Sequence, residues 1–154
     1  GVVNNICLDM DILIADPKKD DFSKYKNAKI ITPNLNELNK ASNIEIKNDQ
    51  SIIDACDEII RKNNFDYIVA KKGDQGITIV GKNNFVKHIK AHSVESPDVT
   101  GAGDTVIAVF SAIYSQTKDI EFSGEVANAA ASIVVGKSGT ATATVGEIEK
   151  LLTK

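Results

Sequence analysis

The sequence predicts an α/β fold, in which a parallel β-sheet is flanked by helices. Short apolar runs typical of buried strands alternate along the chain with longer segments whose apolar residues recur at helical spacing. With 154 residues, of which 42% are hydrophobic and 25% charged, the chain has the size and composition of one globular domain. We therefore expect it to fold as a single unit.

The first half of the chain contains three expected strands and two expected helices. Strands are predicted where an apolar run ends at proline or polar residues, and helices where apolar residues recur every three to four positions. The expected strands span residues 12–15, 30–31 and 67–70, and the expected helices span residues 34–42 and 51–62.

The second half begins with an expected hairpin and continues with helices. The hairpin joins β-like runs at residues 77–80 and 85–89 through a Gly-Lys-Asn-Asn turn. Helices are expected at residues 105–116 and 123–135. A last helix is predicted by a capping-box pattern at Thr144 and Glu147, with its apolar side chains facing inward: Ile148, Leu151 and Leu152. This alternation predicts a Rossmann-like architecture.

The first ten residues do not fit the alternation. They hold only about two helical turns before the strand at residues 12–15, which is less than a crossover between parallel strands needs. We therefore expect the chain to begin inside a fold, as a fragment, a processed product, or a sequence lacking residues at a join.

Composition argues against several classes of function. The formal net charge of -3 and the aromatic content of 5% do not favour nucleic-acid binding. No apolar run approaches the roughly 20 residues that span a bilayer, and no basic signal region is present, so we expect a cytoplasmic protein without membrane partners. Cys7 and Cys56 are expected to be reduced, buried thiols, and His88 and His92 to be ordinary packing or surface residues.

Residues 98–105, Asp-Val-Thr-Gly-Ala-Gly-Asp-Thr, combine an anion-binding turn with a carboxylate at the start of an apolar helix. Gly101 and Gly103 allow a tight turn whose N–H groups converge on an anion, and the helix start adds partial positive charge. A transferring phosphoryl group needs such a cradle, and Asp104 is placed to take a proton from an attacking hydroxyl. The alternative is an ordinary strand-to-helix turn that Asp104 caps.

Asn34 and Glu37 lie three residues apart on one face of the expected helix. An amide and a carboxylate at this spacing can hold a hydrated Mg²⁺, which binds proteins through few carboxylates and several waters. The alternative is that Asn34 caps the helix and Glu37 complements its dipole.

Residues 71–76, Lys-Lys-Gly-Asp-Gln-Gly, follow the strand at residues 67–70. A lysine at such a position can contact nucleotide phosphates as a point charge. The alternative is a solvated turn, and for Lys72 the two interpretations are evenly balanced.

These three segments resemble motifs of the ribokinase-like (PfkB) carbohydrate kinases. Residues 98–105 resemble the family's DTGAGDT-type signature, with Val99 at a position that varies between Thr and Val. Asn34 and Glu37 resemble its Asn-x-x-Glu motif, and residues 71–76 resemble its nucleotide loop, with Lys71 where many relatives carry Thr and some carry Lys. The resemblance implies a ribokinase-like fold, of which residues 1–154 are the carboxy-terminal, nucleotide-binding part.

The resemblance also implies a catalytic role for the glycine-rich segment. Asp104 would be the catalytic base for the anomeric hydroxyl of a sugar. The anion hole would be formed by the residues before it: Gly101, Ala102 and Gly103.

Further roles implied by the resemblance concern ATP and metal ions. Asn34 and Glu37 would organise Mg²⁺ through water, and Asp98 and Thr100 would help to bind a monovalent cation such as K⁺. The nucleotide would be contacted by the loop after residue 70 and by the adenine-side segments at residues 125–131 and 136–140, through Lys71, Gly73, Gly76, Asn128 and Gly139.

A narrower resemblance is to those kinases of the family that convert D-glycero-β-D-manno-heptose 7-phosphate and ATP to the 1,7-bisphosphate, in ADP-heptose and lipopolysaccharide precursor synthesis. It implies a homodimer when the protein is complete, and an amino-terminal half that supplies most sugar contacts, so residues 1–154 alone are expected to be inactive. The open alternatives are a kinase for another sugar or nucleoside and a non-catalytic nucleotide-binding lobe. The resemblance rests on residues 16–18, 21–25, 31–34, 98–108 and 128–142.

Overall fold

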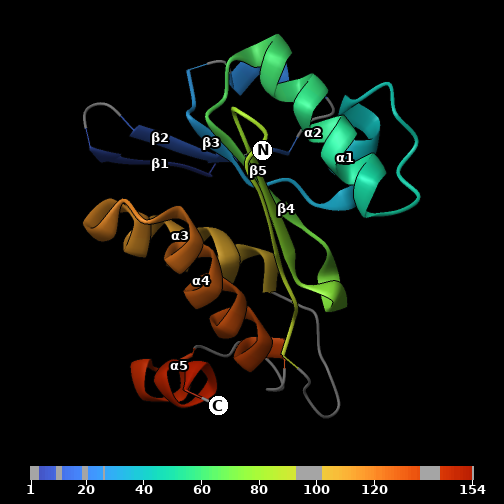
Figure 1. Ribbon diagram of the computed structural model, residues 1–154. Helices are drawn as coiled ribbons and strands as arrows, with labels where there is room; N and C mark the ends of the chain where they lie inside the picture. Colours follow the sequence, from blue (N-terminus) through green and yellow to red (C-terminus); the bar gives the residue numbers. More distant parts are fainter. Residues whose placement is uncertain are drawn as a thin grey trace. The chain divides into compact units, whose positions relative to one another are not determined.

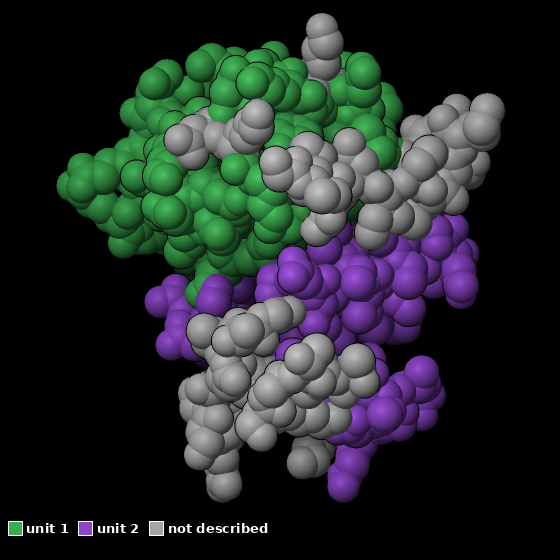
Figure 2. Space-filling view, turned by 180° about the vertical axis from the view of Figure 1, so that it is seen from behind, with its two compact units in different colours: residues 1–72, 78–88 green, residues 73–77, 89–154 purple. Residues whose placement is uncertain are grey.

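The chain divides into two compact units in a computed structural model, which describes residues 4–9, 12–18, 21–25, 27–92, 102–135 and 143–153. The first unit contains residues 1–72 and 78–88, and the second contains residues 73–77 and 89–154 (Figure 2).

A six-stranded sheet has its strands in the order in which they occur along the chain (Figure 1). The second, third and fourth strands are parallel, with Ile14 opposite Ile30 and Ile30 opposite Tyr67. The strands are β1 (Asn4–Asp9), β2 (Ile12–Asp16), β3 (Ile30–Ile31), β4 (Tyr67–Lys71), β5 (Ile77–Gly81) and β6 (Val86–Ile89). The predicted strands and the α/β class are therefore confirmed.

The first strand is one that the sequence analysis did not predict. β1 pairs with β2 in antiparallel orientation, with Asn4 opposite Asp16 and Ile6 opposite Ile14. Only residues 10 and 11 separate the two strands. An antiparallel neighbour can follow a short connection, whereas a parallel one needs a crossover of a dozen residues or more. The short segment before β2 is therefore long enough for the strand that it forms.

Two helices of the first unit contribute side chains to its core. α1 (Leu35–Ala41) contributes buried Leu38. α2 (Asp49–Asn63) begins at the N-cap Asn48 and ends at Asn64, which has a left-handed backbone. The helix is amphipathic because its apolar residues recur at three- and four-residue intervals. Its buried face consists of Ile52, Ala55, Cys56, Ile59 and Ile60.

Cys56 is a free thiol buried in this core. Burial raises its pKa well above the usual range of a thiol, and the negative charge of Asp57 adds to the shift. The expectation of a reduced, buried thiol is confirmed for Cys56, while the side chain of Cys7 lies outside the described part of the structure.

The second unit contains three helices, of which the first two pack together. Phe110 is fully buried and stacks on Tyr114, with ring centroids 5.7 Å apart. The predicted capping box is confirmed, since Glu147 N–H donates to Thr144 Oγ1 over 3.2 Å. The expectation that Leu152 faces inward is wrong: it is the last residue of its helix and is 36% exposed. The helices are α3 (Ala102–Thr117), α4 (Ile120–Val135) and α5 (Val145–Leu152).

Within the ranges that the structure describes, none of the helices is long and apolar enough to cross a bilayer.

Candidate active site

Polar side chains gather where three parallel strands end in the first unit. Asp16 is the last residue of β2, Thr32 follows β3, and Lys71 ends β4. Because the carboxyl ends of parallel strands lie at one edge of a sheet, the three residues come together there. In open α/β sheets, ligands bind outside this edge.

Asp16 is the centre of this cluster and is fully buried. Its Oδ1 accepts a hydrogen bond from Lys71 Nζ over 2.9 Å and another from Thr32 Oγ1 over 3.1 Å. Nζ of Lys18 lies 2.9 Å from Oδ2, at ion-pair distance. Burial alone would raise the pKa of Asp16, but Lys71 and Lys18 outweigh it and hold the pKa below its ordinary value.

Asn34 and Glu37 form the capping box of α1. Asn34 Oδ1 accepts from Glu37 N–H over 2.7 Å, and Glu37 Oε1 accepts from Asn34 N–H over 2.9 Å. The backbone also joins them to the cluster, because Asn34 and Lys71 form a parallel bridge and Lys71 N–H donates to Pro33 O over 2.8 Å. The capping interpretation is thus observed, and the magnesium role stays a prediction.

The donor chemistry of Asn34 and Glu37 fits a hydrated Mg²⁺. An amide oxygen and a carboxylate are hard oxygen ligands, and Mg²⁺ commonly keeps several waters instead of entering an all-protein cage. In the described ranges, no group of three or more His, Cys, Asp or Glu side chains is arranged to hold a metal directly.

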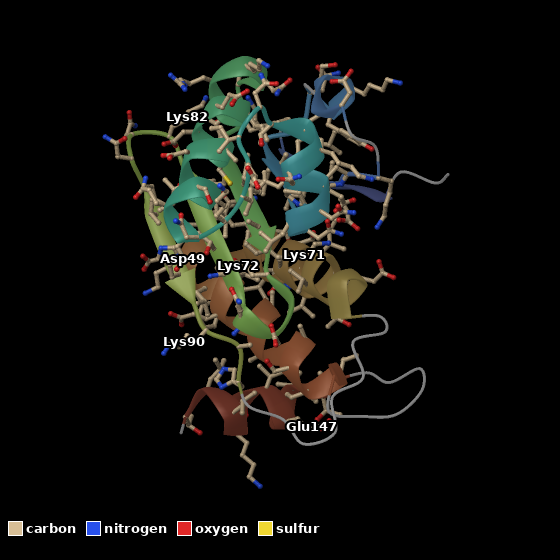
Figure 3. The ribbon with its side chains drawn as sticks, turned by 90° about the vertical axis from the view of Figure 1, so that its right-hand side faces the viewer. Asp49, Lys71, Lys72, Lys82, Lys90 and Glu147 are labelled. Carbon is tan, nitrogen blue, oxygen red and sulfur yellow. The ribbon has the colours of Figure 1, made fainter. Side chains whose placement is uncertain are left out.

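Lys71 and Lys72 have different surroundings, although both follow the buried part of β4 (Figure 3). The side chain of Lys71 is 12% exposed and contacts Asp16. Lys72 is buried, and its Nζ lies 3.4 Å from Asp49 Oδ1 at the start of α2. The solvated-turn interpretation of Lys72 is therefore wrong, because an acidic partner at the helix start compensates for its removal from water.

The glycine loop after Lys72 depends on two left-handed backbone conformations. Gly73 has φ +61° and Gly76 has φ +93°. Nothing lies near Gly73, whereas a Cβ on Gly76 would collide with the backbone of Ile89 and Ala91. The loop therefore needs glycine at residue 76 for space as well as for conformation.

Asp104 lies in the first turn of α3 and is exposed. The first N–H groups of a helix lack partners within the helix, and its dipole is positive there. Gly103, half-buried, belongs to the same turn, which also includes the backbone of Ala102. Four other predicted site residues lie outside the described ranges. They are Gly101 of the anion hole, Asp98 and Thr100 of the predicted cation site, and Gly139 on the predicted adenine side.

Asn128 lies within α4 and is buried. Its side-chain Nδ2 donates to the backbone carbonyl of Lys90 over 2.7 Å, and its backbone carbonyl accepts from Ser132 Oγ over 3.0 Å. The neighbouring Ala127, Ala129 and Ala130 are fully buried. This part of α4 is therefore tightly packed, and a nucleotide contact by Asn128 stays a prediction.

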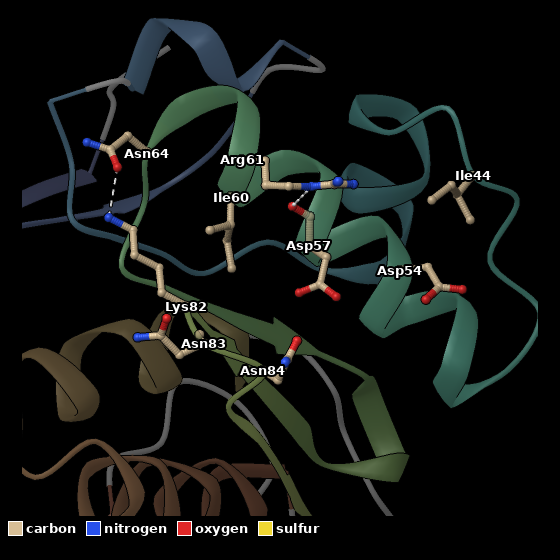
Figure 4. A pocket seen from close by; sticks show the side chains of 10 residues that line it. Ile44, Asp54, Asp57, Ile60, Arg61, Asn64, Lys82, Asn83 and Asn84 are labelled. Atoms are coloured by element: carbon tan, nitrogen blue, oxygen red, sulfur yellow. Dashed lines mark hydrogen bonds between the residues drawn. The ribbon is translucent and has the colours of Figure 1, made fainter.

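A cavity of about 780 Å³ opens in the first unit between α2 and the turn after β5 (Figure 4). Polar and apolar side chains both line it, and burial raises the pKa of Asp57 on its wall. None of the site residues expected from the sequence lines it, so we place the candidate active site at the strand ends. The lining residues are Ile44, Asp54, Asp57, Ile60, Arg61, Asn64, Gly81, Lys82, Asn83 and Asn84.

Asp16 is the part of the cluster whose role the sequence did not reveal. Residues 16–18 were noted only for their resemblance to heptose-phosphate kinases. A signal was available, because an aspartate directly after a buried apolar strand lies at the edge where ligands bind.

Known protein sequences are similar to most of this chain. Residues 4–145 match the model of the pfkB family carbohydrate kinases. The bifunctional protein HldE of Campylobacter curvus is 41% identical over 149 residues, which are 96% of this chain and 31% of that protein. HldE of Mesorhizobium japonicum is 40% identical over 136 residues, 88% of this chain and 27% of that protein. The chain spans less than a third of these relatives.

Solved structures share the fold. Ribokinase from Thermotoga maritima has a TM-score of 0.73 at 26% identity, covering 84% of this chain and 44% of that one. Arabidopsis thaliana ribokinase, complexed with ribose and ATP, has a TM-score of 0.83 at 24% identity, and the match covers 92% of this chain and 47% of that one. Escherichia coli phosphofructokinase-2 in complex with potassium has a TM-score of 0.81 at 22% identity, and the match covers 91% of this chain and 46% of that one. The predicted ribokinase-like fold is confirmed.

Proposed function

The chain belongs to the pfkB family of carbohydrate kinases, and from that premise we propose that it is the carboxy-terminal, nucleotide-binding part of a kinase for D-glycero-β-D-manno-heptose 7-phosphate. The observation that carries the catalytic part is Asp104, an exposed carboxylate in the first turn of a 16-residue helix. The similarity to HldE proteins supports the choice of a heptose phosphate. We place the complete protein in the cytoplasm as a homodimer.

In the proposed reaction, Asp104 accepts the proton of the anomeric hydroxyl while that oxygen forms a bond to the γ-phosphorus of ATP. The bond between this phosphorus and the β,γ-bridging oxygen breaks, and its electron pair leaves with ADP. N–H groups of Gly101, Ala102 and Gly103 stabilise charge on the phosphoryl oxygens. Catalysis here consists mainly of positioning and charge stabilisation.

ATP is proposed to meet Lys71, Gly73 and Gly76, with Asn128 and Gly139 on the adenine side. Lys71 supplies a positive charge, and the glycines allow the backbone to approach the nucleotide.

Bound cations supply charge neutralisation. We propose Asn34 and Glu37 as the residues that hold Mg²⁺ through water, and Asp98 and Thr100 as the residues that hold K⁺. The capping box fixes the orientation of Asn34 and Glu37 before any ligand arrives.

A substrate comparison tests the proposed function. The intact protein that carries this chain is expected to release ADP from ATP only with the heptose 7-phosphate and to form its 1,7-bisphosphate. A coupled ADP assay and mass spectrometry of the product provide the measurement. Turnover with ribose or fructose 6-phosphate instead would assign a different sugar, and ATP binding without any sugar-dependent turnover would indicate a non-catalytic lobe.

Glu37→Gln is expected to raise the Mg²⁺ concentration needed for half-maximal activity roughly tenfold, because the carboxylate orders metal-bound waters. Glutamine keeps the capping box, so the fold is retained. Activity is titrated against free Mg²⁺ at fixed ATP. Glu147→Gln is the matched control, since Glu147 has the same place in the capping box of α5. Equal midpoints in all three proteins would leave Glu37 with the capping role alone.

A further inference from the structure

The buried carboxylate at the end of β2 has two lysine partners. Nζ of Lys71 and Nζ of Lys18 each lie 2.9 Å from an oxygen of Asp16. Lys71 is only 12% exposed, so part of the hydration of its charge has been lost.

Stability is a weak explanation for such a group. Removing charges from water is costly, and buried ion pairs are often no more stabilising than apolar residues of similar volume. A lysine ammonium group held at the ligand-binding edge of the sheet has a clear use if an anion binds there.

The geometry leaves Lys71 able to bind that anion. An ammonium group has three donors, and the bond to Asp16 uses one of them. The Lys71 backbone is fixed as well, by its hydrogen bond to Pro33 O and its bridge to Asn34. Thr32 donates to the same Oδ1 that Lys71 contacts, which holds the carboxylate in one orientation.

We propose that Asp16 is a positioning residue that holds the Lys71 ammonium group at the carboxyl ends of β2 to β4, where this group binds a phosphate of ATP. The inference rests on the proposed function and adds to it a residue that acts on the nucleotide only through Lys71. A flexible lysine would lose side-chain entropy on binding, and Asp16 removes that cost beforehand.

A double-mutant cycle tests this role, with ATP binding measured by calorimetry on the intact protein. Asp16→Asn and Lys71→Met are each expected to weaken ATP binding about tenfold or more. In the Lys71→Met background, Asp16→Asn should change the affinity by less than about twofold, because its only target has gone. A residue that merely supported the fold would weaken binding in both backgrounds.

Controls separate positioning from folding. Asp49→Asn removes the partner of Lys72, in the same unit, and should leave ATP affinity unchanged. Thr32→Val keeps the charges of Asp16, Lys18 and Lys71, and it should weaken ATP binding slightly, again only when Lys71 is present. Thermal unfolding shows whether Asp16→Asn folds. If it does not, Thr32→Val replaces it in the double-mutant cycle.

The outcomes distinguish two failures. The positioning role would be overturned if Asp16→Asn left the affinity for ATP unchanged. It would also be overturned if the Asp16 (or Thr32) substitution weakened ATP binding by the same factor with and without Lys71. In either case, ATP binding by the wild-type protein would still support the proposed function. Absence of ATP binding by the wild-type protein would overturn both.

Discussion

Asp104→Asn is expected to lower kcat about 100-fold or more and to leave ATP affinity nearly unchanged. The variant keeps the size and polarity of the side chain but cannot accept the proton of the sugar hydroxyl. Because Asp104 is exposed in the first turn of α3, its replacement removes no core contact. Steady-state kinetics and calorimetric titration on the intact protein give the two quantities separately.

Glu121→Gln is the matched control for this variant, since Glu121 is also an exposed acid in the first turn of a helix of the second unit. It should retain wild-type kcat. A kcat near the wild-type value in Asp104→Asn would remove Asp104 from the proposed chemistry.

Gly76→Ala is expected to destabilise the fold by about 3 kcal/mol or more. The residue has φ +93°, which side chains rarely adopt, and its new Cβ would collide with backbone atoms that cannot rotate away. Denaturant unfolding at fixed temperature measures the change in the free energy of unfolding.

Gly73→Ala separates the two causes. Gly73 also has a positive φ, but nothing lies near its Cβ position, so only the conformational cost of about 1 kcal/mol is expected. Equal losses in the two variants would show that the collision at Gly76 contributes nothing.

Sequence periodicity predicted most of the fold because strands and helices here obey local rules. Apolar runs ending at Pro17 and Pro33 marked β2 and β3, and the Thr144 and Glu147 pattern marked the start of α5. β1 was missed because strand formation depends on the neighbouring strand with which it pairs, and a short segment of sequence does not indicate that partner.

The candidate site was predictable only in part. Motif spacing identified Asn34, Glu37 and Asp104, whose neighbours are close in sequence. The contact between Asp16 and Lys71 joins residues 55 positions apart, so it arises from strand order and not from any local pattern. Lys72 was ambiguous for the same reason, since its partner Asp49 belongs to a distant helix start.

The placement of Cys56 has a consequence for oxidative damage. Peroxides attack the thiolate, and oxidation to sulfenic acid requires both that form and access from solvent. Cys56 has neither, because it is fully buried and its proton is held tightly. The core of the first unit therefore contains a sulfur atom that packs like a small apolar side chain and is insulated from the redox state of the surrounding solution.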